Sequence, residues 1–237
     1  MRDDSEMWCN LCGGHEFMDM NRRAAVKCTT CLSLERTRAL ELYLARLDLK
    51  RSMRILQIAP DKGLYDFLSK PIASQNYVAA DFDVTRYEFL DRCAFVDLCD
   101  LDDWLDNDFD IIIHRYVLVH TPCDIGYSMH HLDRMFRPEG HQLCVIPIIL
   151  GHWDESFADL PDEERTARFG QFDHVRRLGA ADIARHLGAV IRLPDAPDLA
   201  KDIDPATLQR HNIPEACWTG FNISTVLDFR KGDYLLS

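Results

Sequence analysis

Residues 54–68, RILQIAPDKGLYDFL, contain the pattern from which the architecture of this chain can be inferred. An apolar run, 54–58, is typical of a buried strand, and the stretch 64–69 has the spacing of an amphipathic helix. A strand, a tight turn and a helix in this order commonly hold a cofactor at the edge of an α/β sheet. The turn contains only Gly63, whereas a loop that binds a dinucleotide usually has three glycines. The sequence therefore predicts a cofactor loop that is not built for a pyrophosphate.

From Ser52 onward, short apolar runs alternate with helical stretches, which predicts an α/β sheet with helices on both faces. The expected strands are 54–58, 76–80, 94–96, 110–115, 141–147, 190–193 and 224–230. The expected helices are 64–69, 85–90, 125–136 and 180–187. A further helix over 34–49, with Ser33 as its N-cap, is expected to join this sheet to an N-terminal segment.

Composition limits the classes of partner. The 237 residues carry 27 basic and 39 acidic side chains, a formal charge of −12, which repels a nucleic acid backbone and argues against that partner. The first residues, MRDDSEMWCN, are acidic and polar, so we expect no secretory leader and a cytoplasmic protein. The longest apolar run, 143–150, contains Pro147 and is too short to cross a bilayer, so no membrane partner is expected.

Two CxxC pairs, 9–12 and 28–31, are separated by fifteen residues, GGHEFMDMNRRAAVK. This spacing is typical of a zinc ribbon in which four thiolates fill a tetrahedral structural site and leave no position open for substrate. The expected ligands are Cys9, Cys12, Cys28 and Cys31. Five further cysteines, expected as reduced and mostly buried thiols, are Cys93, Cys99, Cys123, Cys144 and Cys217.

Acidic side chains follow the second and third predicted strands of the main domain. Because ligands of an open α/β sheet lie beyond the carboxyl ends of its strands, Asp81 is placed to accept hydrogen bonds from both hydroxyls of a ribose. Asp97 and its apolar neighbour Leu98 suit the amino group and ring face of an adenine. Taken singly, each carboxylate could equally be a solvated loop residue, and their joint placement is what points to a cofactor.

Several motifs resemble those of class I methyltransferases that use S-adenosylmethionine, and more narrowly the type 11 group with an N-terminal zinc ribbon. The motifs are CTTCLSLERTR (28–38), LQIAPDKGLYDFL (56–68), VDLCDL (96–101), FDIIIHRYVLVHTP (109–122), LDRMFRPEGHQLCVIPI (132–148) and FGQFDHVRRLGAADIARHLG (169–188). Two segments depart from the group's pattern: RPEGH (137–141) replaces a Pro-Gly-Gly turn, and LVHT (118–121) lacks the glutamate of Leu-Glu-His.

The resemblance implies a Rossmann-like, seven-stranded sheet with helices on both faces, preceded by a small zinc ribbon. It implies two parts, a ribbon and linker helix over 1–50 and a methyltransferase domain over 51–237, with a lid insertion at about 151–178. S-adenosylmethionine has no phosphate, so a loop with one glycine can suffice. The implied cofactor-binding residues are Ala59, Pro60, Gly63, Asp81, Phe82, Asp97, Leu98 and His114.

Methyl transfer to a hydroxyl needs a base, and histidine is the natural one at neutral pH. The candidates are His174 with its neighbour Asp173 in the lid, and His120 after the fourth predicted strand. Each histidine could instead hold local structure. The sequence favours transfer to a small-molecule or sugar hydroxyl and leaves the oligomeric state open. Two alternatives are an RNA methyltransferase that uses the ribbon for recognition, and a methyltransferase-like binding protein without activity.

Overall fold

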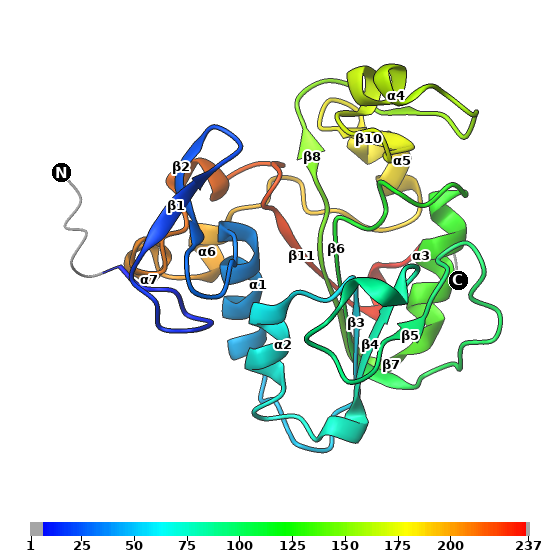
Figure 1. Cartoon of the computed structure of the whole chain (residues 1–237). Coiled ribbons are helices and arrows are strands. Elements are labelled where there is room, and N and C mark those ends of the chain that lie inside the picture. The colour runs from blue at the N-terminus through cyan, green and yellow to red at the C-terminus, as the bar shows by residue number, and fades with distance from the viewer. Residues whose placement is uncertain (1–6, 236–237) are drawn as a thin grey trace.

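A six-stranded sheet in the order β11-β7-β6-β3-β4-β5 forms the centre of this computed structural model, which describes residues 7–235 (Figure 1). The strands are β3 (Ile55–Ile58), β4 (Tyr77–Asp81), β5 (Ala94–Phe95), β6 (Phe109–Arg115), β7 (Phe136–Val145) and β11 (Val226–Phe229). Neighbouring strands are parallel except β11, which pairs antiparallel with β7. The expected Rossmann-like α/β fold is confirmed.

The sheet contains six of the seven expected strands. The segment 190–193 makes a single bridge, between Ile191 and Tyr234, because its backbone bonds to the C-terminal turn instead of to a strand. Arg192 donates its amide to the Asp233 carbonyl at 2.7 Å, and Leu235 donates to the Val190 carbonyl at 2.9 Å. The helix expected over 85–90 is also absent there, where the chain forms only the short 3₁₀ turn Val84–Arg86.

Alternating strand residues bury the two faces of the sheet against different helices (Figure 1). On one face, Ile55 and Ile111 belong to a core that includes residues of α1 (Glu35–Ala45), α2 (Lys62–Leu68), α6 (Leu199–Asp202) and α7 (Pro205–Arg210). On the other face, Leu56 and Ile112 pack with α3 (Ile125–Met135) and α5 (Ile183–His186). Among residues 7–235, no helix combines the length and the apolar character that a bilayer span requires.

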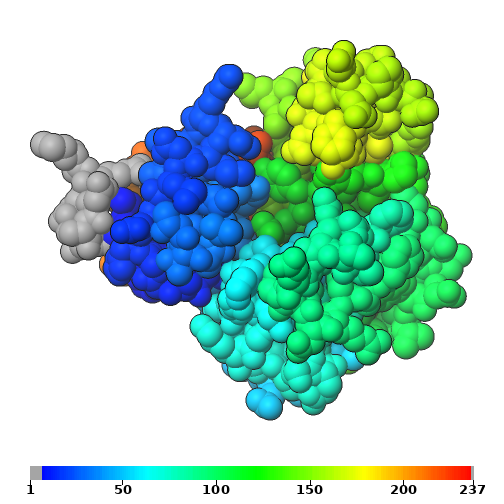
Figure 2. Space-filling model, in the orientation of Figure 1, coloured from blue at the N-terminus to red at the C-terminus, as the bar shows by residue number. Residues whose placement is uncertain are grey.

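The segment 148–179, called the lid here, includes the expected 151–178 insertion and forms a separate small layer. It contains β8 (Ile148–Ile149), β9 (Asp154–Glu155), α4 (Asp162–Phe169) and β10 (Arg176–Gly179), and its three strands pair in the order β8-β10-β9. In Figure 2 this layer, drawn in yellow-green, stands above the part drawn in cyan and teal, and the surface is hollowed between them.

The N-terminal ribbon is a two-stranded hairpin, β1 (Phe17–Met20) and β2 (Arg23–Cys28), followed directly by α1. The sequence predicts Ser33 as the N-cap of α1, and this prediction is wrong. The N-cap is Leu34, which makes no side-chain hydrogen bond. The Ser33 hydroxyl instead lies 3.3 Å from Cys9 Sγ and 3.2 Å from Cys31 Sγ, so it serves the cysteine cluster. Residues 1–6, on which the expected absence of a leader partly rests, lie outside the described chain.

Arg38 connects this ribbon to the C-terminal part of the chain. Its side chain is fully buried and donates to the carbonyls of Val26 and Ser33 on one side and of His211 and Asn212 on the other, at 2.8–3.0 Å. A buried charge in this position depends on these acceptors, because burial removes the solvation that bulk water would supply.

We expect Arg38→Ala to lower the free energy of unfolding by about 3–5 kcal/mol, since four buried carbonyls lose their donor. Arg46→Ala is the matched control, because Arg46 lies just after the same helix with half of its side chain exposed, and its loss should change stability by less than about 0.5 kcal/mol. Chemical denaturation of both variants measures the difference. Equal free energies of unfolding for Arg38→Ala and Arg46→Ala would show that Arg38 does not hold the ribbon and the C-terminal part together.

Candidate functional site

A cavity of about 660 Å³ opens beyond the carboxyl ends of the parallel strands, where the strand order reverses between β3 and β6. This volume is within the range of small-molecule and cofactor sites. Five of the expected cofactor residues line it: Ala59, Asp81, Phe82, Asp97 and Leu98. The lining also includes Arg115, Tyr116, Val117, His120, Thr121, Gln171 and Asp173, so the lid and the loop after β6 complete the wall.

Asp81, at the end of β4, is 7% exposed and held in one orientation. Its Oδ1 accepts the Asp83 amide at 2.8 Å, and its Oδ2 accepts the Tyr87 hydroxyl at 2.6 Å. Burial and the adjacent Asp81 raise the pKa of Tyr87, so the phenol stays protonated and remains a donor. Each carboxylate oxygen has a further lone pair, which leaves acceptor capacity for a ligand in the cavity.

Asp97 is positioned by a local turn, in which its Oδ1 accepts the Cys99 amide at 2.8 Å. Cys99 is joined to Cys123 by a disulfide, so the expectation of free thiols is wrong for these two residues. They are 24 residues apart in sequence and lie on the loops that follow β5 and β6, two strands that are separated in the sheet by β3 and β4. The bridge fixes two neighbouring parts of the cavity wall to each other.

Three residues that the resemblance assigned to cofactor binding lie outside the cavity lining. His114 is fully buried in β6, where its Nε2 lies 2.7 Å from Gln142 Nε2, and burial lowers its pKa to about 4. Pro60 is buried behind the loop. Gly63 faces the ribbon: a Cβ placed on it would lie 3.5 Å from Leu11 Cδ1 and 3.6 Å from Cys31 Sγ.

Two non-glycine residues of the cavity wall adopt left-handed backbone conformations. Ala59, after β3, has a φ of 52°, and Tyr116, after β6, has a φ of 57°. Such conformations cost about 1–3 kcal/mol each and persist only where the surroundings impose them. The two residues directly follow β3 and β6, the strands between which the strand order reverses. The strained backbone therefore lies at the cavity.

The three expected catalytic residues are brought together. One ring nitrogen of His120, one of His174 and a carboxylate oxygen of Asp173 lie within 4.8 Å of one another. The rings of His120 and His174 meet edge to face with centroids 4.7 Å apart, and His120 Nδ1 lies 3.4 Å from Asp173 Oδ2. Burial lowers the pKa of His174, which favours the neutral ring. His120 and Asp173 line the cavity, with His174 behind them.

Arg176 anchors the lid to the cavity wall. The sequence places this residue in the FGQFDHVRR motif but does not predict its role. The side chain is fully buried and donates to the Leu118 carbonyl at 3.0 Å and the Thr121 carbonyl at 3.0 Å. Its Nε also lies 3.2 Å from Glu155 on β9. The loop that carries His120 is therefore attached to the lid by a buried guanidinium.

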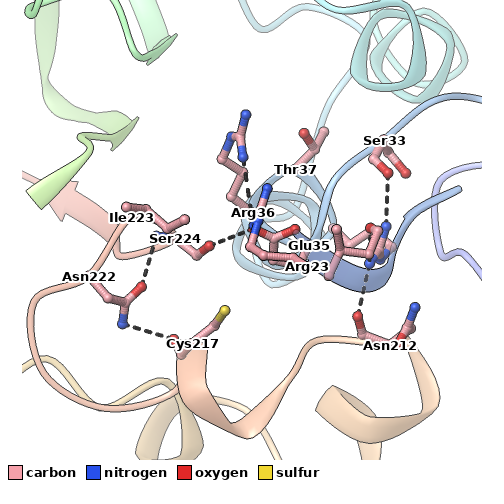
Figure 3. Close-up of polar contacts among 12 residues, drawn as sticks. Arg23, Ser33, Glu35, Arg36, Thr37, Asn212, Cys217, Asn222, Ile223 and Ser224 are labelled. Atoms are coloured by element: carbon pink, nitrogen blue, oxygen red, sulfur yellow. Dashed lines mark hydrogen bonds and ion pairs between the residues drawn. The ribbon is translucent and has the colours of Figure 1, made fainter. Parts of the chain in front are cut away.

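A second group of charges lies where the ribbon meets the sheet (Figure 3). The fully buried Glu35 carboxylate accepts hydrogen bonds from Arg23 and, at 2.9 Å, from the Ser224 hydroxyl, while Arg36 lies 3.8 Å away. The Arg36 guanidinium stacks 4.3 Å above the ring of Tyr116, a residue of the cavity wall. This group connects the ribbon, the C-terminal segment and the cavity.

The four expected metal ligands of the ribbon also form one cluster, in which the Sγ atoms lie within 4.8 Å of one another. Cys9 and Cys31 are 3.6 Å apart, as are Cys12 and Cys28. A tetrahedral zinc with bonds of about 2.3 Å places its sulfurs about 3.8 Å apart, so the cluster fits this ion. The Gly14 amide points to Cys12 Sγ at 3.4 Å, and His15 turns away to the Met7 carbonyl.

No protein-family model matches the sequence, and no curated protein matches it. Solved structures with a similar fold include the YcgJ protein of Bacillus subtilis, 16% identical over 76% of this chain and 80% of that protein, with a TM-score of 0.47. The [4+2]-cyclase SpnF is 17% identical over 79% of this chain and 66% of its own, with a TM-score of 0.45. The methyltransferase CalH, whose structure was solved in complex with SAH, is 20% identical over 45% of this chain and 33% of its own, with a TM-score of 0.31. Likenesses at this level assign no function to the chain.

We expect the purified protein to contain about one zinc per chain, because the four sulfurs match a closed tetrahedral site. Cys12→Ser should remove the metal and lower stability, whereas Cys217→Ser, at a cysteine outside the cluster, should leave both unchanged. Metal analysis and thermal unfolding report the two effects. A stably folded wild-type protein without metal would contradict the assignment.

Proposed function

We propose that the protein is a methyltransferase that uses S-adenosylmethionine. The observation that carries the proposal is the joint position of Asp81 and Asp97, which follow adjacent strands and line one cavity with Ala59 at the switch point. Such carboxylates suit the ribose hydroxyls and the amino group of an adenosine. The β3–α2 turn lacks the glycines that cradle a pyrophosphate, which favours a nucleoside cofactor without phosphates over NAD.

The electrostatics of the cavity support a cationic cofactor. Asp81, Asp83, Asp97 and Asp173 line it against only two arginines, Arg86 and Arg115. Arg115 is neutralised by Asp61, whose Oδ2 lies 2.5 Å from its guanidinium. A sulfonium and an amino group would be attracted into such a cavity, whereas a polyphosphate would be repelled.

The bound cofactor would supply an already activated methyl group, so the protein mainly has to align the acceptor and accept its proton. We propose a hydroxyl of a small molecule or sugar as the acceptor. His120 and Asp173 line the lid side of the cavity, and His174 lies behind them with its Nδ1 3.1 Å from the Phe169 carbonyl. This contact makes Nδ1 the donor, so Nε2 of His174 is the atom that can accept a proton.

Calorimetric titration with S-adenosylmethionine tests the cofactor. We expect saturable binding to the wild-type protein, and Asp81→Ala should weaken it by about 10- to 100-fold because charge-assisted hydrogen bonds to the ribose are lost. Asp91→Ala is the matched control, since Asp91 is exposed and does not line the cavity. No heat at millimolar cofactor would contradict the proposed function, and equal affinities for the two variants would show that Asp81 is the wrong acid.

His174→Ala separates the proton acceptor from cofactor binding. Once an acceptor is in hand, we expect turnover to fall by about 10²–10⁴-fold with little change in affinity for S-adenosylmethionine. His130→Ala, an exposed position on α3 away from the cavity, should retain activity. Unchanged turnover in His174→Ala would exclude this ring from the reaction.

A further inference from the structure

We propose that His120, Asp173 and His174 bind a divalent transition-metal cation on the lid side of the cavity, with open positions that take the acceptor's oxygen. The basis is the convergence of two imidazole nitrogens and one carboxylate oxygen within 4.8 Å. Two of these side chains line the cavity that holds the cofactor residues. The inference rests on the proposed function and specifies how the acceptor hydroxyl is activated.

His174 is the fixed ligand of this site. It is 7% exposed, and the contact of its Nδ1 with the Phe169 carbonyl sets both the tautomer and the orientation of the ring. Its Nε2 is buried and has no hydrogen-bond partner in the described chain. A histidine that donates one N–H to a backbone carbonyl and keeps the other nitrogen free has the arrangement typical of a metal ligand. A buried nitrogen without a partner otherwise costs free energy.

The other two ligands can move to meet a cation. A bond of about 2.0–2.2 Å from each ligand requires ligand atoms about 3 Å apart, closer than the 4.8 Å limit of the cluster. His120 and Asp173 have 38% and 39% of their side chains exposed, so each has solvent on one side into which it can rotate. His120 Nδ1 lies 3.4 Å from Asp173 Oδ2 and 3.3 Å from the Asp173 carbonyl, and a cation would replace these contacts.

The ligand set selects the class of cation. Two imidazoles and one carboxylate suit Mn²⁺, Fe²⁺, Co²⁺ or Zn²⁺ better than Mg²⁺ or Ca²⁺, which prefer oxygen ligands. Three protein ligands leave positions open, unlike the four cysteines of the ribbon, which form a closed set. The two metal sites of the chain therefore differ in chemistry and can be distinguished by the metal used as a probe.

The cation changes one step of the proposed reaction. A cation held by His120, Asp173 and His174 would lower the pKa of an acceptor hydroxyl that coordinates it, so that the proton could pass to water. The deprotonated oxygen would then attack the methyl carbon as the carbon–sulfur bond breaks, and the neutral thioether would leave. With the cation bound, Nε2 of His174 would be a ligand, and water would replace it as the acceptor of the hydroxyl proton. An acceptor with two neighbouring oxygens, such as a vicinal diol or a hydroxy acid, would use two of the open positions.

Manganese binding by the zinc-loaded protein, residues 1–237, tests the site without cofactor or acceptor. Mn²⁺ has low affinity for thiolates and so leaves the ribbon intact. Electron paramagnetic resonance of free Mn²⁺ during titration should show about one bound ion per chain, and an enhanced relaxation rate of water protons should show open positions. Binding should be lost in His174→Ala and in Asp173→Asn, the second of which changes a half-exposed side chain and keeps its size.

His152→Ala is the matched control, because His152 is an exposed histidine whose Nδ1 lies 3.2 Å from another aspartate of the lid region, Asp182. Absence of binding at millimolar Mn²⁺, or equal loss of binding in His152→Ala, would overturn the site. Binding of Mn²⁺ without an enhanced relaxation rate of water protons would show that the bound ion has no open positions, and it would overturn the role of the site in holding the acceptor. Titration with S-adenosylmethionine in the absence of Mn²⁺ reports separately on the proposed function, so failure of one does not imply failure of the other.

Discussion

Arg115 is the residue on which the arrangement of the cavity depends. It ends β6, and its guanidinium reaches Asp61 Oδ2 at 2.5 Å and the Thr37 hydroxyl at 3.0 Å. Asp61 is in turn the N-cap of α2, accepting the Leu64 amide at 3.0 Å. One side chain therefore ties together the strand that borders the switch point, the turn after β3 and the helix that follows the ribbon. Since this guanidinium is mostly buried, these contacts are not exchanged for water at little cost.

The strained residues follow from this arrangement. Ala59 and Tyr116 adopt positive φ values next to the ends of β3 and β6, and Arg115 immediately precedes Tyr116. The Tyr116 hydroxyl donates to the Ile223 carbonyl at 2.7 Å, and Arg36 covers its ring, so the residue is held from both ends. Contacts from three segments can maintain a conformation that costs about 1–3 kcal/mol. These contacts fix the shape of this part of the cavity wall.

The parts of the fold that depend on local pattern could be predicted, and those that depend on distant partners could not. Six strands and α2 and α3 follow from apolar periodicity, and Asp81 and Asp97 from their place after strands. The segment 190–193 has a strand-like composition, but its partner is a C-terminal turn. His114 was assigned from a motif, and its burial depends on which strand face it occupies. The roles of Arg115 and Arg176 and the Cys99–Cys123 bridge require knowledge of which loops meet in space.

The N-terminal ribbon packs against the turn that follows β3. Gly63, the second residue of α2, lies next to Leu11, the third residue of the first CxxC pair, and next to Cys31, the last residue of the second pair. The cysteine-bearing segment therefore supports this turn. Thr37, on the helix that follows the second knuckle, reinforces it through Arg115. The ribbon therefore supports this turn, and zinc held by its four cysteines would stabilise that support.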